Sequence, residues 1–386
     1  MKIAIVGAGL MGRLLALSLH RQAECKVSLF DKDTKLAHNS AAYAAAGLLT
    51  PLGESLHCEK NIVAMGFESL TLWPTLLSSL DEHTFFQQSG AIMVSHEQDK
   101  GDYLRFVRHL ENNYPTKKVQ TLNRAQINEL EPELGRSFNQ GLYLPQEGQI
   151  GNRRLLVALR KQLEQENITW HSETFVTDIK KTSTGCTLTY QQCNTQQHQH
   201  FDLVIDCRGT GATHKQANNC APLTDLRSVR GELFQLFAPN VHLSRPIRLM
   251  HPRYQLYIAP KGKGFYVVGA TEIESDDKAN MTVRSAMELL SAAYSVHPGF
   301  AEANIRQHIS QTRPAFSDNQ PKIFVQDSLI QVNGLFRHGF LIAPVVLKQI
   351  MASVENIQNC SENPLPYEHL LPTQRIQQEL AHEHSH

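Results

Sequence analysis

Three glycines near the start of the sequence, Gly7, Gly9 and Gly12, have the spacing Gly-x-Gly-x-x-Gly. In such a loop the first glycine permits a tight turn, the second lets the backbone approach a pyrophosphate, and the third lets a helix pack closely on a strand. Asp31 lies about 20 residues after Gly12, where an acidic side chain accepts hydrogen bonds from an adenosine ribose. This spacing predicts a dinucleotide-binding site, and a fortuitous glycine-rich turn is the alternative.

The segments around these residues have the patterns of a strand, a helix and a second strand. Lys2 to Val6 suits a buried parallel strand, Arg13 to Gln22 reads as a helix, and Val27 to Phe30 suits a strand that ends at Asp31. The helix would present free N–H groups to the pyrophosphate at its N-terminus, where the helix dipole also favours an anion.

The next segment, Asn39 to Pro51, is rich in alanine. Side chains this small let a flat ring lie almost against the backbone, which favours a flavin over a nicotinamide. A tightly packed alanine helix is the other interpretation of the segment.

Two kinds of pattern alternate along the rest of the chain. Strand and helix patterns return from Asn152 to Gly211, where Phe201 to Cys207 reads as one strong strand. Phe85 to Tyr143 and Val229 to Gly269 are instead richer in the alternation of apolar and polar residues that is typical of antiparallel strands. We therefore expect a Rossmann-like α/β domain interleaved with an antiparallel-sheet substrate domain, so that the whole is α+β. The expected boundaries are 1–80, 145–220 and 310–360 for the first domain, 81–144 and 221–309 for the second, and 361–386 for a C-terminal strap and tail.

Several motifs in this order resemble the amino-acid and amine oxidases of the D-amino acid oxidase superfamily, and most closely the bacterial glycine oxidases. The matching pieces are Gly7 to Gly12, Ala45 to Leu49 with Pro51, Val229 to Glu232, Leu256 to Pro260, Gly269 to Glu272, Arg313-Pro314 with Asp318 and Pro321, and Gly334 to Pro344. The resemblance implies a flavoprotein that oxidises a small amino acid such as glycine, sarcosine or a small D-amino acid to an imine or 2-oxo acid. It further implies O2 or a quinone-type compound as electron acceptor, and a role in thiamine thiazole synthesis.

The resemblance also implies non-covalent FAD, bound along the first domain. Asp31 and Lys32 would meet its ribose, Ala46, Gly47 and Leu48 its ring, and the backbone at Val176 its adenine. The residues that the resemblance assigns to the cofactor are Gly7, Gly9, Leu10, Met11, Gly12, Asp31, Lys32, Ser40, Ala41, Ala46, Gly47, Leu48, Val176, Gly209, Gly334, Leu335, Phe336, His338, Gly339, Phe340 and Leu341.

Arg313, Arg337 and Tyr257 are suited to hold an amino acid, and the family pattern points to the same three. A guanidinium can bind a carboxylate through two parallel N–H bonds, which would place the substrate α-carbon over the flavin. Each has a plainer interpretation: a surface turn for Arg313, a phosphate or carbonyl clamp for Arg337, and strand packing for Tyr257. Of the two arginines, we expect Arg337 to matter more, because its loop also touches the flavin in the resembling family.

The sequence departs from the family pattern at two positions. Lys261 stands where relatives commonly carry arginine, and His338 where asparagine is common. These differences leave the choice of amine substrate open. A D-amino acid dehydrogenase and an N-methyl amino acid oxidase are the alternatives within the family, and a nicotinamide dehydrogenase or a non-enzymatic FAD-holding protein are the alternatives outside it.

Composition bounds the remaining possibilities. The chain has 386 residues, with 37 Lys and Arg against 37 Asp and Glu, so its formal net charge is zero, which argues against a nucleic-acid or acidic-membrane binder. Seven cysteines without a Cys-x-x-Cys pair suggest a reducing compartment, and we expect a cytoplasmic protein without a membrane-spanning segment. A monomer and a homo-oligomer are both left open. His382, His384 and His386 form a His-rich end, for which we expect solvation and no metal.

Overall fold

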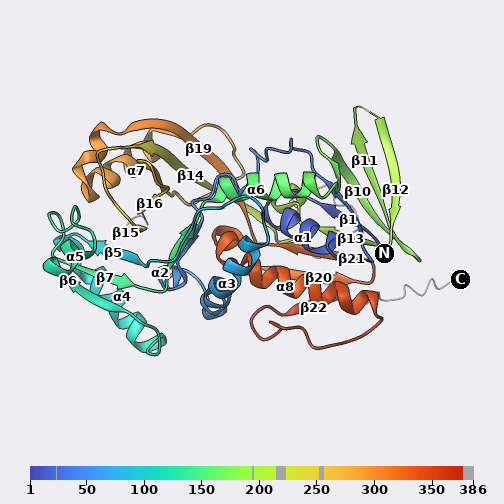
Figure 1. Cartoon of the computed structure of the whole chain (residues 1–386), viewed down its shortest axis with the longest axis horizontal. Coiled ribbons are helices and arrows are strands. Elements are labelled where there is room, and N and C mark those ends of the chain that lie inside the picture. Colours follow the sequence, from blue (N-terminus) through green and yellow to red (C-terminus); the bar gives the residue numbers. More distant parts are fainter. Residues whose placement is uncertain (23, 194, 214–222, 252–255, 377–386) are drawn as a thin grey trace, which may run out of the picture.

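A mixed seven-stranded sheet, to the right in Figure 1, contains the first strand of the chain. The computed structural model describes residues 1–22, 24–193, 195–213, 223–251 and 256–376. Within these residues the strand order of this sheet is β22 (Thr373–Arg375), β20 (Lys322–Gln326), β21 (Leu329–Asn333), β13 (Leu203–Asp206), β1 (Lys2–Val6), β2 (Lys26–Phe30) and β9 (Thr169–His171). The strands from β21 to β9 are parallel, as expected for a Rossmann-like domain.

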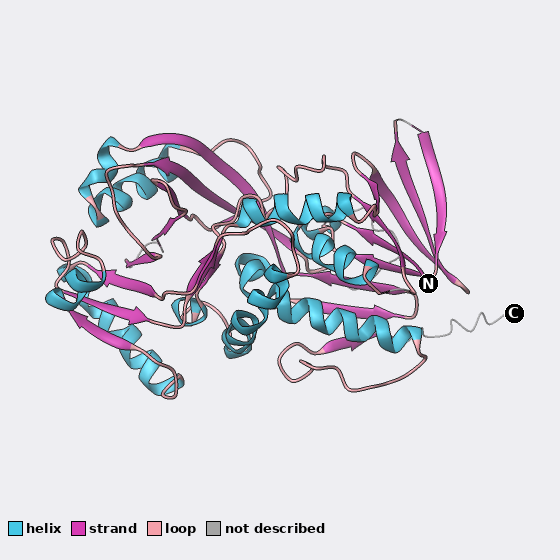
Figure 2. Ribbon diagram, viewed as in Figure 1, coloured by secondary structure: helices cyan, strands magenta, loops and turns pink. Residues whose placement is uncertain are grey.

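Four helices lie on one face of this sheet (Figures 1 and 2), and residues of a separate three-stranded sheet cover the other face. The helices are α1 (Leu10–His20), α3 (Lys60–Ser78), α6 (Asn152–Gln165) and α8 (Gly339–Gln358). Helix α1 packs on both α6 and α8, and α3 packs on α8. Their apolar side chains join those of β1 and β13 in the largest hydrophobic core of the described chain. The predicted strand–glycine loop–helix–strand unit at the start of the sequence is confirmed, with α1 beginning at Leu10 and not at Arg13.

A second, largely antiparallel sheet of nine strands lies at the other end of the described molecule (Figure 2). Its strands are β18 (Ile273–Glu274), β14 (Arg227–Phe237), β17 (Phe265–Gly269), β16 (Leu256–Pro260), β15 (Ile247–Met250), β5 (Ala91–Ser95), β7 (Gln140–Leu144), β6 (Gln120–Asn123) and β19 (Asn304–Ala315), the last paired with β14. The helices of this region are α4 (Lys100–Asn113), α5 (Arg124–Leu130) and α7 (Val283–Val296). The predicted mixed α and β fold is therefore confirmed, and the domain boundaries given above stay a prediction.

Short elements connect the two sheets. They are β3 (Leu48–Leu49), α2 (Pro51–Glu54), β4 (Phe86–Gln87) and β8 (Gly148–Ile150). The alanine-rich segment before β3 forms turns and not a helix, which excludes the alternative of a packed alanine helix.

One sequence-based expectation about strands was wrong. Phe201 to Cys207 is not one strand, because the chain changes sheets at Asp202, where the Lys2 N–H donates to the Asp202 carboxylate at 2.6 Å. We also expect a hairpin tip from the glutamine-rich polar segment Gln191 to His200, and this segment does contain the junction of two antiparallel strands. Most of it belongs to β12 (Thr195–Phe201), which pairs with β11 (Gly185–Gln192) and, through it, with β10 (Phe175–Thr182) in a separate three-stranded sheet.

The last described residues follow the expected irregular strap. Ser361 to Pro372 has no helix or strand and leads into β22 at the edge of the seven-stranded sheet. The sequence also suggests a short helix from the end of the strap to Leu380. Its first residues form β22 instead, and the rest of it lies outside the described residues, as do His382, His384 and His386.

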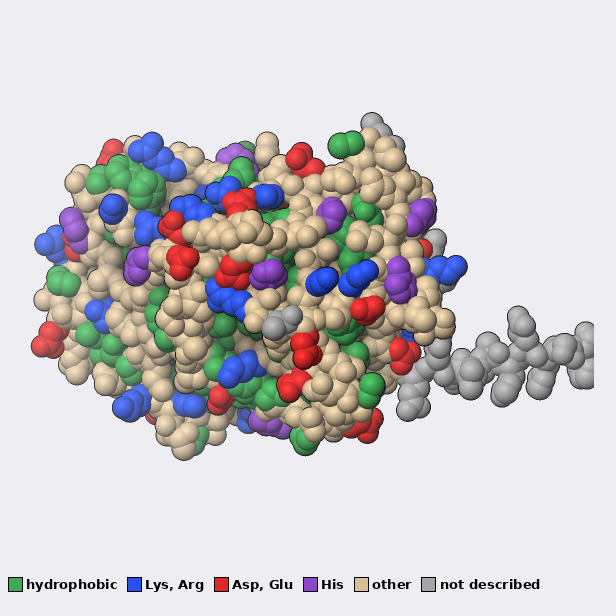
Figure 3. Space-filling view, turned by 45° about the vertical axis from the view of Figure 1, so that its right-hand side comes forward, with side chains coloured by type: hydrophobic (Ala, Val, Ile, Leu, Met, Phe, Trp, Pro, Cys, Tyr) green, Lys and Arg blue, Asp and Glu red, His purple; other side chains and the backbone are tan. Residues whose placement is uncertain are grey.

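Charge and hydropathy agree with this arrangement. Basic and acidic side chains are intermingled on the face shown in Figure 3, as the balanced composition suggests. Among the described residues, Phe336–Gln358 is long and apolar enough to cross a membrane, but 72% of its most apolar window is buried inside the protein. We therefore assign α8 to the core of the fold.

Candidate active site

A cavity of about 1400 Å³ runs between the seven-stranded sheet and the nine-stranded sheet. It exceeds the roughly 300–1,000 Å³ of a typical small-molecule pocket, so it has room for a dinucleotide and a small substrate together. Most of the residues predicted to hold the cofactor line it: Gly7, Gly9, Leu10, Met11, Asp31, Lys32, Ser40, Ala41, Ala46, Gly47, Leu48, Gly209, Leu335, Phe336, His338, Gly339, Phe340 and Leu341.

Three predicted cofactor residues do not line the cavity. Gly12 lies behind the glycine loop, and a β-carbon there would come within 1.7 Å of the Gly7 carbonyl oxygen, so its role is to let α1 pack on β1. Gly334 sits in the turn before Phe336, against the ring of Phe316. Val176 is buried in β10 and faces the core next to Phe30 and Tyr190.

The glycine loop fits a pyrophosphate. A β-carbon on Gly9 would meet no described protein atom within 4 Å, so the space in front of this residue is open to a ligand. Helix α1 starts directly after Gly9, and no side chain caps its first N–H groups. Backbone donors at a helix N-terminus are a favourable site for a phosphate.

Asp31 lies at the end of β2, in the wall of the same cavity. Its carboxylate accepts hydrogen bonds from the N–H groups of Ala8 and Asp33, the latter at 2.7 Å. Burial raises the pKa of Asp31. The carboxylate thus holds the glycine loop in place and keeps lone pairs that a ribose hydroxyl can use.

A buried arginine, Arg13, supports the loop from behind. Its guanidinium donates to the carbonyl groups of Ala8, Leu156 and Lys35 at 2.7–2.8 Å. Burial lowers the pKa of Arg13 to about 10, so the side chain stays charged at neutral pH. The sequence pattern predicted that Arg13 lies in a helix, but it did not predict these hydrogen bonds.

At the far end of the cavity, α8 begins beside Arg337 and His338. His338 is buried, and its Nδ1 has no hydrogen-bond partner in the described structure. Burial lowers the pKa of His338 to about 4, so the ring is neutral at pH 7. An unpartnered ring nitrogen next to a helix N-terminus suits the polar edge of a bound ring.

Arg313, Tyr257 and Arg337 all line the cavity at this end, as the sequence predicted. Tyr257 comes from β16 and Arg313 from the end of β19, whereas Arg337 follows β21 of the other sheet. Burial raises the pKa of the Tyr257 hydroxyl, which therefore remains a hydrogen-bond donor. Three distant segments thus bring two cations and a donor to one place.

The two arginines differ in their partners. Arg337 forms ion pairs with Glu54 at 3.1 Å and with Glu272 at 2.8 Å. Burial alone would lower the pKa of Arg337, but the two carboxylates outweigh it and raise this pKa. Arg313 donates to the Thr271 carbonyl at 3.2 Å and belongs to none of the ion pairs found among the described residues.

Sequence reasoning missed the acidic residues of this site. Glu54 ends α2 and is buried between Arg248 and Arg337; burial alone would raise the pKa of Glu54, but these two guanidinium groups lower it. Glu272 belongs to the motif Gly269 to Glu272, and this motif was the only sequence feature that indicated a role for Glu272 in the site. Neither carboxylate is suited to act as a base while it is paired with Arg337.

Comparison with known proteins identifies the family. Residues 2–352 match the family model described as "FAD dependent oxidoreductase". The chain belongs to this family. It is an FAD-dependent oxidoreductase, and the cavity residues described above fit the cofactor.

Two relatives and one solved structure are instructive. The chain is 33% identical to the "Putative thiamine biosynthesis oxidoreductase ThiO" of Rhizobium etli, over 91% of this chain and 95% of the relative. It is 22% identical to a glycine oxidase of Bacillus licheniformis, over 88% and 89% of the two chains. The crystal structure of glycine oxidase from Geobacillus kaustophilus superposes with a TM-score of 0.79 at 23% identity and covers 97% of this chain and 99% of its own, which confirms the fold.

Proposed function

We propose that this protein oxidises a small α-amino acid, with glycine, sarcosine and small D-amino acids as the substrate class, and that it serves thiamine biosynthesis. The observation that carries the substrate class is the guanidinium of Arg313, which has no carboxylate partner among the described residues and lies in the same cavity as Tyr257. The similarity to the Rhizobium etli protein supports the pathway.

The carboxylate of the amino acid would bind Arg313 and the Tyr257 hydroxyl. A guanidinium offers two parallel N–H donors, which fix both the position and the plane of a carboxylate. This contact holds the substrate in one orientation, and correct orientation can supply a large part of the rate enhancement.

Bound FAD supplies the two-electron acceptor to which the α-hydrogen passes as a hydride. The residues of the chain orient the substrate and keep the charge of its carboxylate balanced. Tyr257 keeps its proton, the lowered pKa of His338 makes its ring a poor base, and Glu54 is paired with Arg337. None of these three side chains is therefore suited to take a proton from the amine, which reacts as the free base. Loss of the hydride and of one N–H proton gives an imino acid, and water converts this to a 2-oxo acid and ammonia, or methylamine where the substrate is sarcosine.

We infer that O2 takes the two electrons together with two protons, giving hydrogen peroxide; a quinone-type acceptor is the alternative. We further infer that the protein works in the cytoplasm, because the cysteines within the described residues, including the exposed Cys193 and Cys360, form no disulfide. We expect no nucleic-acid partner, and a homo-oligomer is an alternative to a monomer.

The test is anaerobic reduction of the purified flavoprotein. We expect glycine, sarcosine or D-alanine to bleach the flavin absorbance, whereas benzylamine, which has no carboxylate, should reduce it far more slowly. Readmission of air should then yield one peroxide for each flavin reduced. Failure of all three amino acids to bleach the flavin would overturn the proposed function, and reoxidation by a quinone without peroxide would favour a dehydrogenase.

A further inference from the structure

Glu272 is the more exposed of the two carboxylates that pair with Arg337. Its carboxylate pairs with Nη1 of Arg337 at 2.8 Å, and 46% of its side chain is exposed against 18% for Arg337. Glu272 lies just before β18, in a segment whose residues Thr271 to Glu274 line the cavity. An incoming substrate therefore meets Glu272 before it reaches Arg337.

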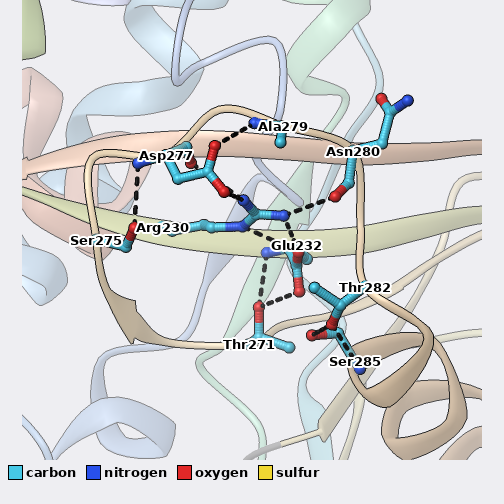
Figure 4. A network of polar contacts seen from close by, with 9 residues as sticks. All are labelled: Arg230, Glu232, Thr271, Ser275, Asp277, Ala279, Asn280, Thr282 and Ser285. Atoms are coloured by element: carbon cyan, nitrogen blue, oxygen red, sulfur yellow. Dashed lines mark hydrogen bonds and ion pairs between the residues drawn. The ribbon is translucent and has the colours of Figure 1, made fainter.

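A buried network fixes the segment that carries Glu272 (Figure 4). Arg230 of β14 is 3% exposed and donates to the Asp277 carboxylate at 2.7 Å and to the Asn280 carbonyl at 2.9 Å. Thr271 is tied to Glu232 in both directions, because its N–H donates to the Glu232 carbonyl at 3.2 Å and its hydroxyl accepts from the Glu232 N–H at 2.9 Å. Both ends of the segment are thus anchored, and Glu272 is held beside Arg337.

Three arginines of the site, Arg248, Arg313 and Arg337, share two charged carboxylates, so one of the three has no carboxylate partner among the described residues. Arg248 and Arg337 share Glu54, and Arg337 also has Glu272. Glu147 lies behind this group, where burial raises its pKa to about 8, so at neutral pH it is mostly uncharged. Three guanidinium groups and two carboxylates leave a single positive charge, at Arg313, which one substrate carboxylate would neutralise.

We propose that Glu272 is a specificity-determining residue, which occupies Arg337 and thereby restricts the site to amino acids with one carboxylate. A second carboxylate, as in iminodiacetate or D-aspartate, would have to displace Glu272 from Arg337 or lie next to it unpaired. Such like-charge contact is a common means of rejecting a competing ligand. This inference rests on the proposed function, the oxidation of an amino acid. The preference of the site for one carboxylate over two can nevertheless be measured separately from oxidation.

The decisive measurement uses ligands that are not oxidised. Acetate carries one carboxylate and malonate two, and binding of each to the flavoprotein is followed by the change in flavin absorbance. We expect Glu272→Gln to strengthen malonate binding about tenfold, while acetate binding changes less than about twofold. Asp276→Asn is the matched control, because it removes one negative charge from the same exposed segment and should leave the ratio of the two affinities as it is.

A second arm measures oxidation. Glu272→Gln should raise kcat/KM for iminodiacetate relative to glycine by a similar factor. If the variant loses its flavin, Glu272→Ser addresses the same question. An unchanged malonate-to-acetate ratio, equal strengthening of both ligands, or the same effect in Asp276→Asn would each overturn the proposal. Because acetate and malonate are not substrates, these outcomes are distinct from a failure of glycine, sarcosine and D-alanine to reduce the flavin.

Discussion

The guanidinium of Arg313 lies directly over Gly231 of the neighbouring strand, where a β-carbon would come within 2.2 Å of Arg313 Cζ. Gly231 thus leaves the space that the arginine occupies. The atoms in the way belong to the end of a flexible side chain, so Gly231→Ala should displace the guanidinium and leave the backbone of β14 intact. We expect the variant to retain FAD but to lose flavin reduction by glycine about as strongly as Arg313→Ala does. Normal reduction by glycine would show that the position of this guanidinium is unimportant.

Replacement of the two arginines should have unequal effects. Arg313→Ala leaves the substrate carboxylate without its partner, and loss of one member of a buried charge pair costs about 2–5 kcal/mol. Arg313→Lys should rescue little, because an ammonium lacks the planar pair of donors. The sequence favoured Arg337 as the more important arginine, but its ion pairs with Glu54 and Glu272 lead us to expect a smaller loss for Arg337→Ala. Anaerobic flavin reduction by glycine and by benzylamine compares the variants, and a larger loss in Arg337→Ala would reverse the assignment.

Two glycines of the fingerprint should fail in different ways. Gly9→Val places a side chain where no described protein atom lies, so the chain should fold but purify without flavin. Gly12→Val drives a side chain into the Gly7 carbonyl, so it should destabilise the fold itself. Flavin content and thermal unfolding of the apoproteins separate the two effects, and a Gly9→Val protein with full flavin would contradict the placement of the pyrophosphate.

Glu147 should make stability depend on pH in an unusual direction. Its Oε1 accepts from the Gly53 N–H at 2.8 Å, and burial raises its pKa from 4.5 to about 8. The folded protein therefore binds more protons than the unfolded chain between these values, and stability falls as the pH rises through this window. Glu147→Gln mimics the protonated acid, so the free energy of unfolding should fall less from pH 5 to pH 8. Urea titrations of both proteins at several pH values provide the test, and identical pH slopes would refute it.

Local patterns were enough to predict the part of the site that one continuous segment builds. The strand, glycine loop and helix from Lys2 to His20 follow from an apolar run and three glycines, because neighbours in sequence determine that geometry. The break at Asp202 was not predictable in this way. It depends on a contact with Lys2, which is 200 residues away.

The carboxylates of the site escaped prediction for the same reason. Glu54, Arg248 and Glu272 come from three segments and acquire their roles only by meeting Arg337 and each other. An isolated glutamate in a polar segment has no periodicity or spacing that distinguishes it from a solvated one. Arg13 was missed because its partners are backbone carbonyls, which any sequence supplies.

The strand order of the seven-stranded sheet has a consequence for how the chain acquires its shape. β1 lies between β2 and β13, and β13 pairs in turn with β21, so a central part of this sheet joins residues about 330 positions apart. Such long-range pairings form late, because the entropy of closing the intervening loops must be lost first. The N-terminal turn of α8, which closes one end of the cavity, comes later still in the sequence. The yellow colour of bound flavin should therefore appear only in chains in which β21 has joined the sheet and α8 has formed, which makes it a readout of this late step of folding.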